Sequence, residues 1–142
     1  MSSFSLPLAA EGLIPHRLPM RLVEKLLEVD GKKAIVAAQI AVECPLVDST
    51  GKLEDIVLVE LIAQSHAVLN GYYDQLNARP VRQGFLVEVK KAEWFGVAYA
   101  GEKLLVRIDT LANLDAFTIA TGEVWRGDTL LASGEIKVWV SS

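Results

Sequence analysis

The 142-residue chain has a single cysteine and no long uninterrupted apolar run. Cys44 has no second cysteine to pair with, so an internal disulfide is excluded. Its place beside Pro45 predicts a half-buried structural thiol rather than a reactive one. The longest apolar stretch is broken by Glu60, Gln64 and His66, so no segment reaches the roughly 20 apolar residues that a membrane-spanning helix needs.

Basic residues and phosphate-binding motifs are also scarce. Fourteen Lys and Arg stand against 18 Asp and Glu, a net charge of −4 that argues against a broad nucleic-acid surface. The sequence has no Gly-rich phosphate loop and no Cys/His cluster with metal-ligand spacing, so we expect no metal or nucleotide cofactor. Residues 1–10 lack the basic and apolar regions of a secretory signal, which predicts a cytoplasmic protein.

The length and the apolar fraction of 51% are typical of one domain with a sizeable core. Proline and glycine are spread singly, with no repeat and no linker, which predicts a single domain over residues 1–142. Residues 53–76 are apolar at helical spacing on nearly every side, so we expect a long helix wrapped by sheet or by a partner. Ser49, Thr50 and Gly51 supply helix breakers and candidate cap residues before it.

The rest of the chain has the alternation of β-strands. The expected strands cover residues 33–42, 84–93, 102–111, 116–125 and 130–140. Arg126-Gly127-Asp128 lies between the last two and is interpreted as a hairpin turn, not an adhesion motif. One long helix with mainly meandering strands predicts an α+β hotdog fold, an antiparallel sheet wrapped around one central helix. Its exposed sheet edge favours a dimer.

Three segments give the sequence a family resemblance. The opening Ile14-Pro15-His16-Arg17-Leu18-Pro19-Met20-Arg21-Leu22-Val23, continuing to Leu27-Glu28-Val29-Asp30, resembles that of the β-hydroxyacyl-acyl-carrier-protein dehydratases. The helix segment Val59-Glu60-Leu61-Ile62-Ala63-Gln64 is similar to their Glu-x-x-Ala-Gln signature. The segment Gly84-Phe85-Leu86 through Ala92-Glu93-Trp94-Phe95 resembles their next strand. The resemblance implies a hotdog enzyme that handles acyl thioesters.

Glu60 is unusual on its own chemistry, because it is a carboxylate in the middle of an apolar helix. Apolar surroundings disfavour the charged form of a carboxylate, which suits a group that exchanges protons near neutrality. Dehydration of a 3-hydroxyacyl thioester requires such exchange, and Gln64, one turn later, is placed to hold a hydroxyl or the carboxylate. The alternative is that Glu60 pairs with a basic residue at a dimer seam.

The sequence also departs from the family. Its members have a catalytic His in a Gly-His-Phe-Pro-Gly loop before the helix, whereas residues 45–55 contain none. Asp48 and Asp55 lie in and after this loop, where a carboxylate caps a helix or serves catalysis. Some hotdog thioesterases, which this sequence also resembles, use such a carboxylate to drive water onto a thioester, so hydrolysis stays open. Asp48 is therefore a candidate catalytic residue beside Glu60 and Gln64.

Neither histidine of the chain is an obvious replacement for the missing one. His66 lies six positions after Glu60, roughly 120° around the helix, so the two side chains cannot pair within it. We expect His66 to be hydrogen-bonded packing, with Asn70 as a partner, and His16 to pack the N-terminal arm near the helix.

The loop Pro45-Leu46-Val47-Asp48-Ser49-Thr50-Gly51 resembles that of the dehydratase-like proteins of polyene and lipid gene clusters. The exposed sheet edge makes a homodimer the default, whereas this resemblance implies a heterodimer in which a His-bearing paralogue donates the missing residue. Phe85, Leu86 and Trp94 are candidates for lining an acyl tunnel, or are plain core. An acidic acyl carrier protein would favour local basic residues. The candidates are Arg79, Arg82, Lys90 and Lys91.

Three functions therefore remain open: a dehydratase that uses Glu60, a non-catalytic subunit that supports a dehydratase partner, and an acyl thioesterase that uses Asp48 or Asp55. We rank them in that order. The sequence does not distinguish carrier-protein from coenzyme A thioesters, nor does it give the length of the acyl chain.

Overall fold

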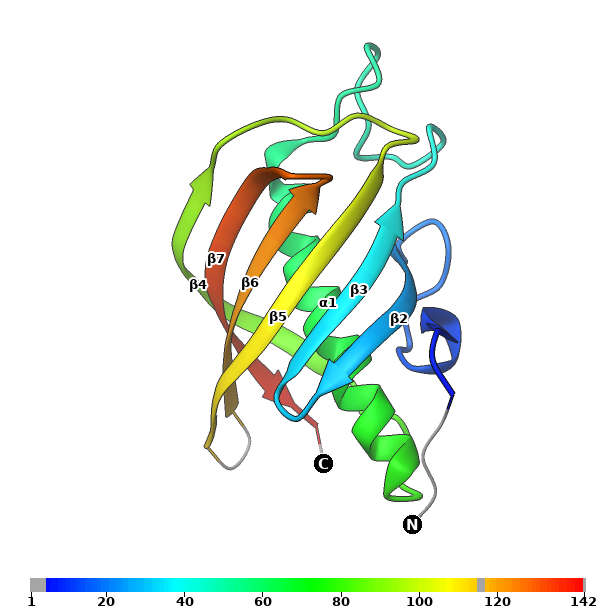
Figure 1. The fold of residues 1–142 in the computed structure, drawn as a ribbon, viewed down its shortest axis with the longest axis vertical. Coiled ribbons are helices and arrows are strands. Elements are labelled where there is room, and N and C mark those ends of the chain that lie inside the picture. Colours follow the sequence, from blue (N-terminus) through cyan, green and yellow to red (C-terminus); the bar gives the residue numbers. More distant parts are fainter. Residues whose placement is uncertain (1–4, 115–116, 142) are drawn as a thin grey trace.

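A computed structural model describes residues 5–114 and 117–141 of the chain. A single antiparallel sheet of seven strands curls around one long helix, α1 (Asp55–Leu76), as Figure 1 shows. A short 3₁₀ helix, η1 (Ala10–Gly12), belongs to the N-terminal arm that leads into the sheet. This arrangement confirms the predicted α+β hotdog fold.

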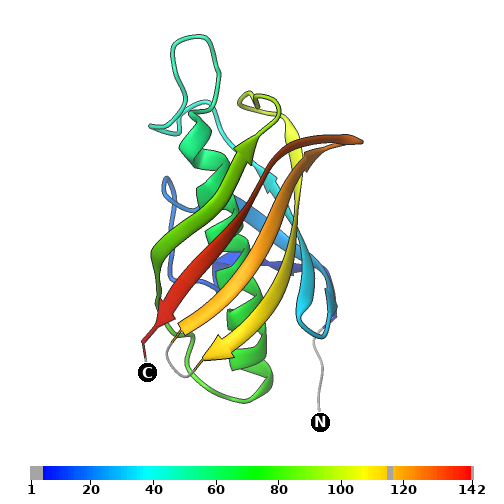
Figure 2. The same ribbon diagram turned by 90° about the vertical axis from the view of Figure 1, so that its left-hand side faces the viewer.

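The seven strands follow the order β1-β2-β3-β5-β6-β7-β4, so β1 and β4 form the two edges. In Figure 2, β4 lies beside β7 along one side of α1. Their bounds are β1 (Leu8–Ala9), β2 (Val23–Asp30), β3 (Lys33–Gln39), β4 (Gly84–Trp94), β5 (Lys103–Leu114), β6 (Phe117–Arg126) and β7 (Thr129–Val140).

The five strands expected from the sequence are confirmed within a few residues, except that Ala116 lies outside the described residues. Arg126 ends β6 and Thr129 begins β7, so the Arg-Gly-Asp triplet forms a hairpin turn as predicted. Gly127 has a φ of 57° there, a conformation that favours glycine. Strands β1 and β2 were not expected: what was interpreted as an arm already joins the sheet at Leu8 in β1 and again at Val23 in β2.

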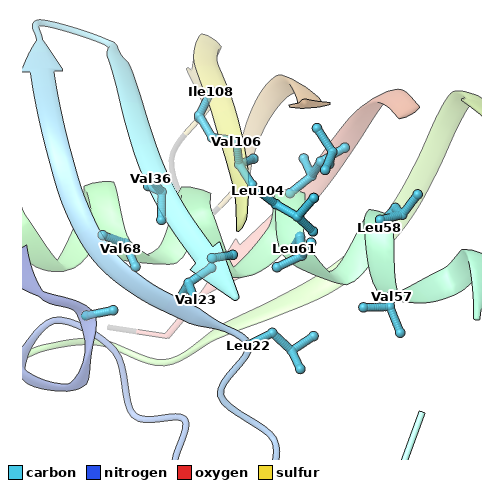
Figure 3. Close-up of a cluster of buried hydrophobic side chains, with 14 of the residues drawn as sticks. Leu22, Val23, Val36, Val57, Leu58, Leu61, Val68, Leu104, Val106 and Ile108 are labelled. Atoms are coloured by element: carbon cyan, nitrogen blue, oxygen red, sulfur yellow. The ribbon is translucent and has the colours of Figure 1, made fainter. Parts of the chain in front are cut away.

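The core fills the space between the concave sheet face and the helix. Side chains alternate along β5, where Leu104, Val106 and Ile108 are buried. They meet Leu61 and Val68 of α1, and Figure 3 shows the helix side chains directed at the strands. Each fully buried aliphatic side chain contributes about 1.5–3 kcal/mol, so this contact holds the helix to the sheet.

The N-terminal arm packs against a different side of the helix. Gln75 Nε2 donates to the Gly12 carbonyl at 2.6 Å, and Gly71 lies directly beneath the backbone of Leu13. A Cβ built on Gly71 would lie 1.8 Å from the Leu13 carbonyl oxygen. The absence of a side chain at this position lets the arm reach the helix surface.

Gly71→Ala should therefore destabilise the protein, although alanine is the better helix former by about 1 kcal/mol. Backbone cannot move aside as a flexible side chain can, so we expect a net loss of about 1–3 kcal/mol in denaturant unfolding. Gly12→Ala is the matched control, because nothing lies within 4 Å of its added Cβ. Equal stability of the two variants would contradict the packing of the arm.

The helix begins later than the sequence indicated, at Asp55. Glu54 is the N-cap residue and makes no side-chain cap hydrogen bond. Ser49, Thr50 and Gly51 cap nothing and form a turn in the preceding loop, which is held by an isolated bridge between Val47 and Leu53. The expectation that these three residues cap the helix was wrong.

Candidate active site

Glu60 lies half-buried in the second turn of α1, where the buried side chain of Gln64 holds its carboxylate. Gln64 Nε2 donates to Glu60 Oε2 at 2.8 Å and to the Met20 carbonyl at 2.8 Å. The Leu22 N–H donates to Gln64 Oε1 at 2.8 Å. Because its amide is bound on both sides, Gln64 fixes one carboxylate oxygen of Glu60 and joins it to the arm.

Glu60 belongs to a face of α1 that the sheet and the arm leave only partly covered. At about 100° per residue, the side chains of this face fall within roughly 80° of one another around the helix. All are half-buried or exposed, and Ile56 is 54% exposed. This surface, called the open face below, consists of Ile56, Glu60, Ala63, Ala67 and Asn70.

Edge strand β4 continues the open face to one side. Leu86 and Trp94 pair across the strands with the buried residues Val138 and Ala132, so their side chains lie on the concave side of the sheet. They nevertheless stay 41% and 43% exposed. Val89 faces the same way and is 38% exposed. These three apolar side chains line a strip beside the open face.

The predicted tunnel residues therefore fall into two groups. Leu86 and Trp94 lie on the side of the sheet that bears Glu60, and Trp94 Nε1 donates to the Asp55 carbonyl at 2.9 Å. Phe85 lies on the outer face, where its ring stacks on Trp139 with centroids 5.5 Å apart. Only Leu86 and Trp94 are on the side from which a substrate can approach Glu60.

Asp48 organises its own loop. Its Oδ1 accepts hydrogen bonds from the Thr50 N–H at 2.8 Å, the Thr50 hydroxyl at 2.6 Å and the Lys52 N–H at 3.0 Å. The hydrogen bonds from Thr50 lower the pKa of the Asp48 carboxyl below its usual value. Asp55 is exposed in the first turn of α1. Asp48 thus has a structural role that needs its charged form.

His66 differs from the expectation drawn from the sequence. It is 1% exposed, and neither ring nitrogen has a hydrogen-bond partner. Burial lowers the pKa of His66 from 6.5 to about 4. The predicted bond to Asn70 was wrong, because neither ring nitrogen of His66 has a partner although Asn70 lies one turn later. His16 is half-buried in the arm, and its Nδ1 also lacks a partner.

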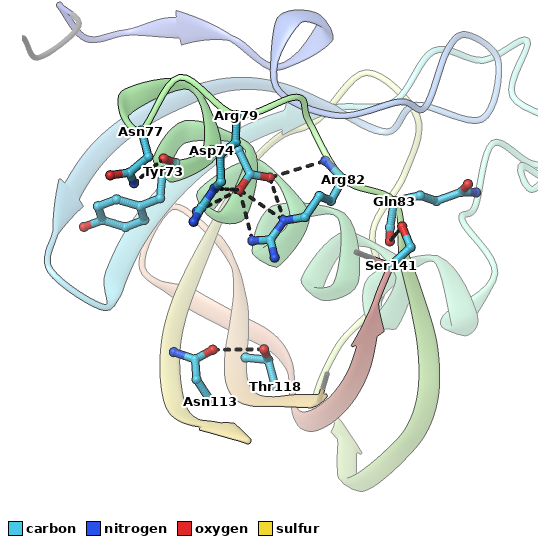
Figure 4. A network of polar contacts seen from close by, with 9 residues as sticks. All are labelled: Tyr73, Asp74, Asn77, Arg79, Arg82, Gln83, Asn113, Thr118 and Ser141. Atoms are coloured by element: carbon cyan, nitrogen blue, oxygen red, sulfur yellow. Dashed lines mark hydrogen bonds and ion pairs between the residues drawn. The ribbon is translucent and has the colours of Figure 1, made fainter. Parts of the chain in front are cut away.

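The four basic residues after the helix are all engaged in ion pairs. Lys90 pairs with Glu88 at 3.1 Å and Lys91 with Glu135 at 3.9 Å. Arg79 and Arg82 both bind Asp74 at the end of α1, as Figure 4 shows. The arginine pair is thus separate from the two lysine pairs, each of which is neutral.

Two hollows have walls that do not include Glu60. One of about 700 Å³ is on the outer sheet face, lined mainly by charged residues of β2 to β7. Another of about 360 Å³ lies between the arm and the segment after β3, with Cys44, 7% exposed, in its wall. Among the described residues, no three His, Cys, Asp or Glu side chains are grouped to hold a metal ion. No described helix has the length and apolar character of a membrane span.

The sequence did not identify several parts of this site. The backbone of Met20 and Leu22 binds Gln64 from more than 40 residues away in the chain, a contact that no local pattern reports. Val89 was not singled out either. The exposed apolar residues Phe85, Leu86, Val87 and Val89 in a strand that ends the sheet are the signal that could have indicated it.

Solved structures with a similar fold define the class of protein. The dehydratase heterocomplex ApeI:P from Xenorhabdus doucetiae superposes with a TM-score of 0.87 at 19% identity, over 95% of this chain and 92% of that one. The smu.793 protein of Streptococcus mutans, bound to acetyl CoA, gives 0.64 at 9% identity over 90% and 94% of the chains. The chain is a hotdog-fold protein.

Sequence relatives and a family model are more specific. A 3-hydroxyacyl-[acyl-carrier-protein] dehydratase FabZ from Roseobacter denitrificans is 26% identical over 136 residues, covering 92% of this chain and 86% of the relative. YcsD of Bacillus subtilis, an uncharacterised protein, is 24% identical over 89% of this chain and 95% of its own length. The model of the ApeP-like family, described as ApeP dehydratase, matches residues 8–142. The chain belongs to this ApeP-like dehydratase family.

Proposed function

We propose that this protein is the glutamate-bearing subunit of a dehydratase for (3R)-hydroxyacyl thioesters, and that a second hotdog subunit completes its active site. One observation carries the proposal. The Glu60 carboxylate lies at the border of the open face, fixed by Gln64, and Gln64 is its only hydrogen-bond partner among the described residues. Glu60, one of the two groups that a proton-transfer pair needs, is thus held in position on the open face.

The reaction needs two such groups. One accepts a proton from C2 of the acyl chain while the other delivers a proton to the departing C3 hydroxyl. The C3–O bond breaks, the C2–C3 double bond forms and water leaves. Glu60 fills one role, with Oε2 bound to Gln64 and Oε1 directed at the substrate. A histidine of the partner fills the other role, because the loop before the helix, residues 45–55, contains none and His66 is only 1% exposed.

The expected partner is a His-bearing paralogue. The similar structure from Xenorhabdus doucetiae is described as a dehydratase heterocomplex, which supports two unlike hotdog subunits. Strand β4 is the natural junction, because its free edge has unpaired backbone groups and its concave side exposes Leu86, Val89 and Trp94 beside Glu60. A subunit that extends the sheet at β4 covers this strip and brings its own loop toward the open face.

The substrate is an acyl thioester of acyl carrier protein or of coenzyme A. The named activity of the FabZ relative supports the first, and the acetyl CoA complex of the smu.793 structure supports the second. The apolar strip of β4 suits an acyl tail, which needs a dry slot. A role in fatty-acid, polyene or lipid biosynthesis follows from this chemistry, in a cytoplasmic protein.

Val89→Asp should prevent assembly along β4. The new carboxylate would be buried without a partner at the centre of the junction, and burial of an unpaired charge is strongly unfavourable. Native mass spectrometry should show dissociated subunits, with the circular dichroism of the fold unchanged. Val42→Asp is the matched control, because Val42 is 66% exposed in a loop outside β4. Intact assemblies of the Val89 variant would exclude β4 as the junction.

Product analysis tests the reaction itself. The assembled protein is given a 3-hydroxyacyl thioester, and mass spectrometry separates loss of water from release of free acid. Loss of water is the expected result. Free acid would instead establish the thioesterase, and replacing Asp48 and Asp55 by Asn would then identify the carboxylate responsible. No turnover by the assembly would contradict the proposed dehydratase, whereas loss of water that survives Glu60→Gln would leave the non-catalytic subunit as the correct description.

A further inference from the structure

The C-terminal end of α1 carries a rigid pair of arginines on one buried carboxylate. Asp74 is 1% exposed. Its Oδ1 lies 3.0 Å from the Nη2 atom of Arg79 and also 3.0 Å from the Nη2 atom of Arg82. The Arg82 N–H also donates to Asp74 Oδ2 at 3.3 Å (Figure 4). Two positive charges and one negative charge leave a net charge of +1.

Both guanidinium groups remain accessible although they are held in place. The side chains of Arg79 and Arg82 are 49% and 37% exposed. Asp74 fixes their positions, so a ligand that binds them loses less side-chain freedom than one that binds mobile arginines. Planar guanidinium donors match the oxygens of a phosphate.

This arginine pair and Glu60 lie at two ends of the same helical surface. Asp74 follows Glu60 by 14 residues, which places it within roughly 40° of Glu60 around the helix and about 21 Å along its axis. The open face between them carries the small side chains of Ala63 and Ala67 and the amide of Asn70. A narrow ligand can lie along it and form hydrogen bonds with that amide.

We propose that Arg79 and Arg82 bind the phosphate of a phosphopantetheine thioester whose acyl group reaches Glu60. The inference rests on the proposed function and names the part of the substrate that this end of the site recognises. From bond lengths, an extended phosphopantetheine arm places its phosphate roughly 20 Å from C2 of the acyl group, which matches the separation along α1. The arm runs in the seam between α1 and the partner subunit. Carrier proteins and coenzyme A share this arm.

The first test measures the contribution of the phosphate alone. Calorimetry compares the binding of pantetheine 4′-phosphate and of pantetheine to the assembled protein. The wild type should bind the phosphorylated compound about tenfold to a hundredfold more tightly, as expected for charge-assisted hydrogen bonds. Arg79→Gln should reduce this preference by about tenfold, whereas Arg79→Lys should retain part of it. Arg82 still pairs with Asp74 in both variants, so the buried carboxylate keeps its partner.

Arg107→Gln is the matched control, because Arg107 lines the hollow on the outer sheet face. An unchanged preference in Arg79→Gln would overturn the inference. The result is independent of catalysis: a wild type that prefers the phosphate but does not dehydrate would contradict the proposed function and leave the phosphate site standing.

Steady-state kinetics then identify the source of the phosphate. If the arm is recognised in both substrates, Arg79→Gln should raise KM for the carrier-protein thioester and the coenzyme A thioester alike. If KM rises for only one of the two thioesters and the preference for pantetheine 4′-phosphate is also lost, the arginines bind the phosphate of that thioester. A rise for the carrier protein alone, with the preference unchanged, would mean that Arg79 meets the acidic surface of the carrier and would overturn phosphate recognition.

Discussion

Glu60→Gln should lower the rate of dehydration by the assembled protein by about 100- to 10,000-fold, the usual contribution of a positioned proton-transfer group. Glutamine has the same shape, and its side-chain oxygen can still accept the hydrogen bond from Gln64. The substitution therefore removes proton exchange and leaves the packing of the open face. Mass spectrometry of the products at saturating substrate gives kcat, and the assembly is checked by native mass spectrometry.

Glu28→Gln is the control, because Glu28 is an exposed residue of β2 that lines the hollow on the outer sheet face. It should keep the wild-type rate. A Glu60 variant that assembles and retains the wild-type rate would contradict the catalytic role. A Glu60 variant that no longer binds the partner subunit would instead support a structural role, in which Glu60 forms an ion pair with a basic residue at the seam between the subunits.

The unfolding free energy should fall by about 3 kcal/mol between pH 6.5 and about 4 because of His66 alone. The unfolded chain takes up a proton on this histidine below its usual pKa of 6.5, whereas burial keeps the folded form neutral until the pH approaches 4. In this window the unfolded state binds more protons, so acid favours unfolding. Below it both states are protonated and the loss levels off.

Denaturant titrations at a fixed protein concentration across this range measure the effect, with His66→Leu as the comparison. Leucine fills a similar volume without ring nitrogens and titrates nothing, so the variant should lack this part of the pH dependence. The wild type and the His66→Leu variant share the buried carboxyl of Asp74 and the contacts of the N-terminal arm. The contributions of these groups therefore cancel when the two pH curves are subtracted. Parallel curves for the two proteins would show that the folded protein takes up the proton on His66 as readily as the unfolded chain.

The sequence predicted the helix and the second half of the sheet because both have simple periods. Strands β5 to β7 alternate strictly over their central residues, and the helix is apolar on nearly all sides. Strand β2 was not predicted, because two register shifts interrupt its pairing with β3. Its inward residues Val23, Leu26 and Val29 consequently recur at every third position, which a search for alternation does not detect.

The sequence identified the main residues of the site, but it did not predict the contacts that hold them in place. Glu60 and Gln64 were found because a carboxylate and an amide one turn apart are unusual in an apolar helix, and the structure joins them. The anchoring of Gln64 to Met20 and Leu22 depends on how the arm crosses the helix, which only the folded chain specifies. For His66, the apolar helix around it indicated packing, but sequence spacing could not show that both ring nitrogens would lack partners.

If the two proton-transfer groups are divided between two subunits, activity should depend on assembling both. Reconstitution of the complex from its purified subunits measures this directly. The purified chain, a His-bearing hotdog dehydratase subunit and their mixture are each given the same 3-hydroxyacyl thioester, and loss of water is followed by mass spectrometry. The chain alone should be inactive and the mixture should dehydrate the substrate, with the activity lost again when Glu60→Gln replaces the wild type. Dehydration by the purified chain alone at the rate of the mixture would contradict this division between subunits.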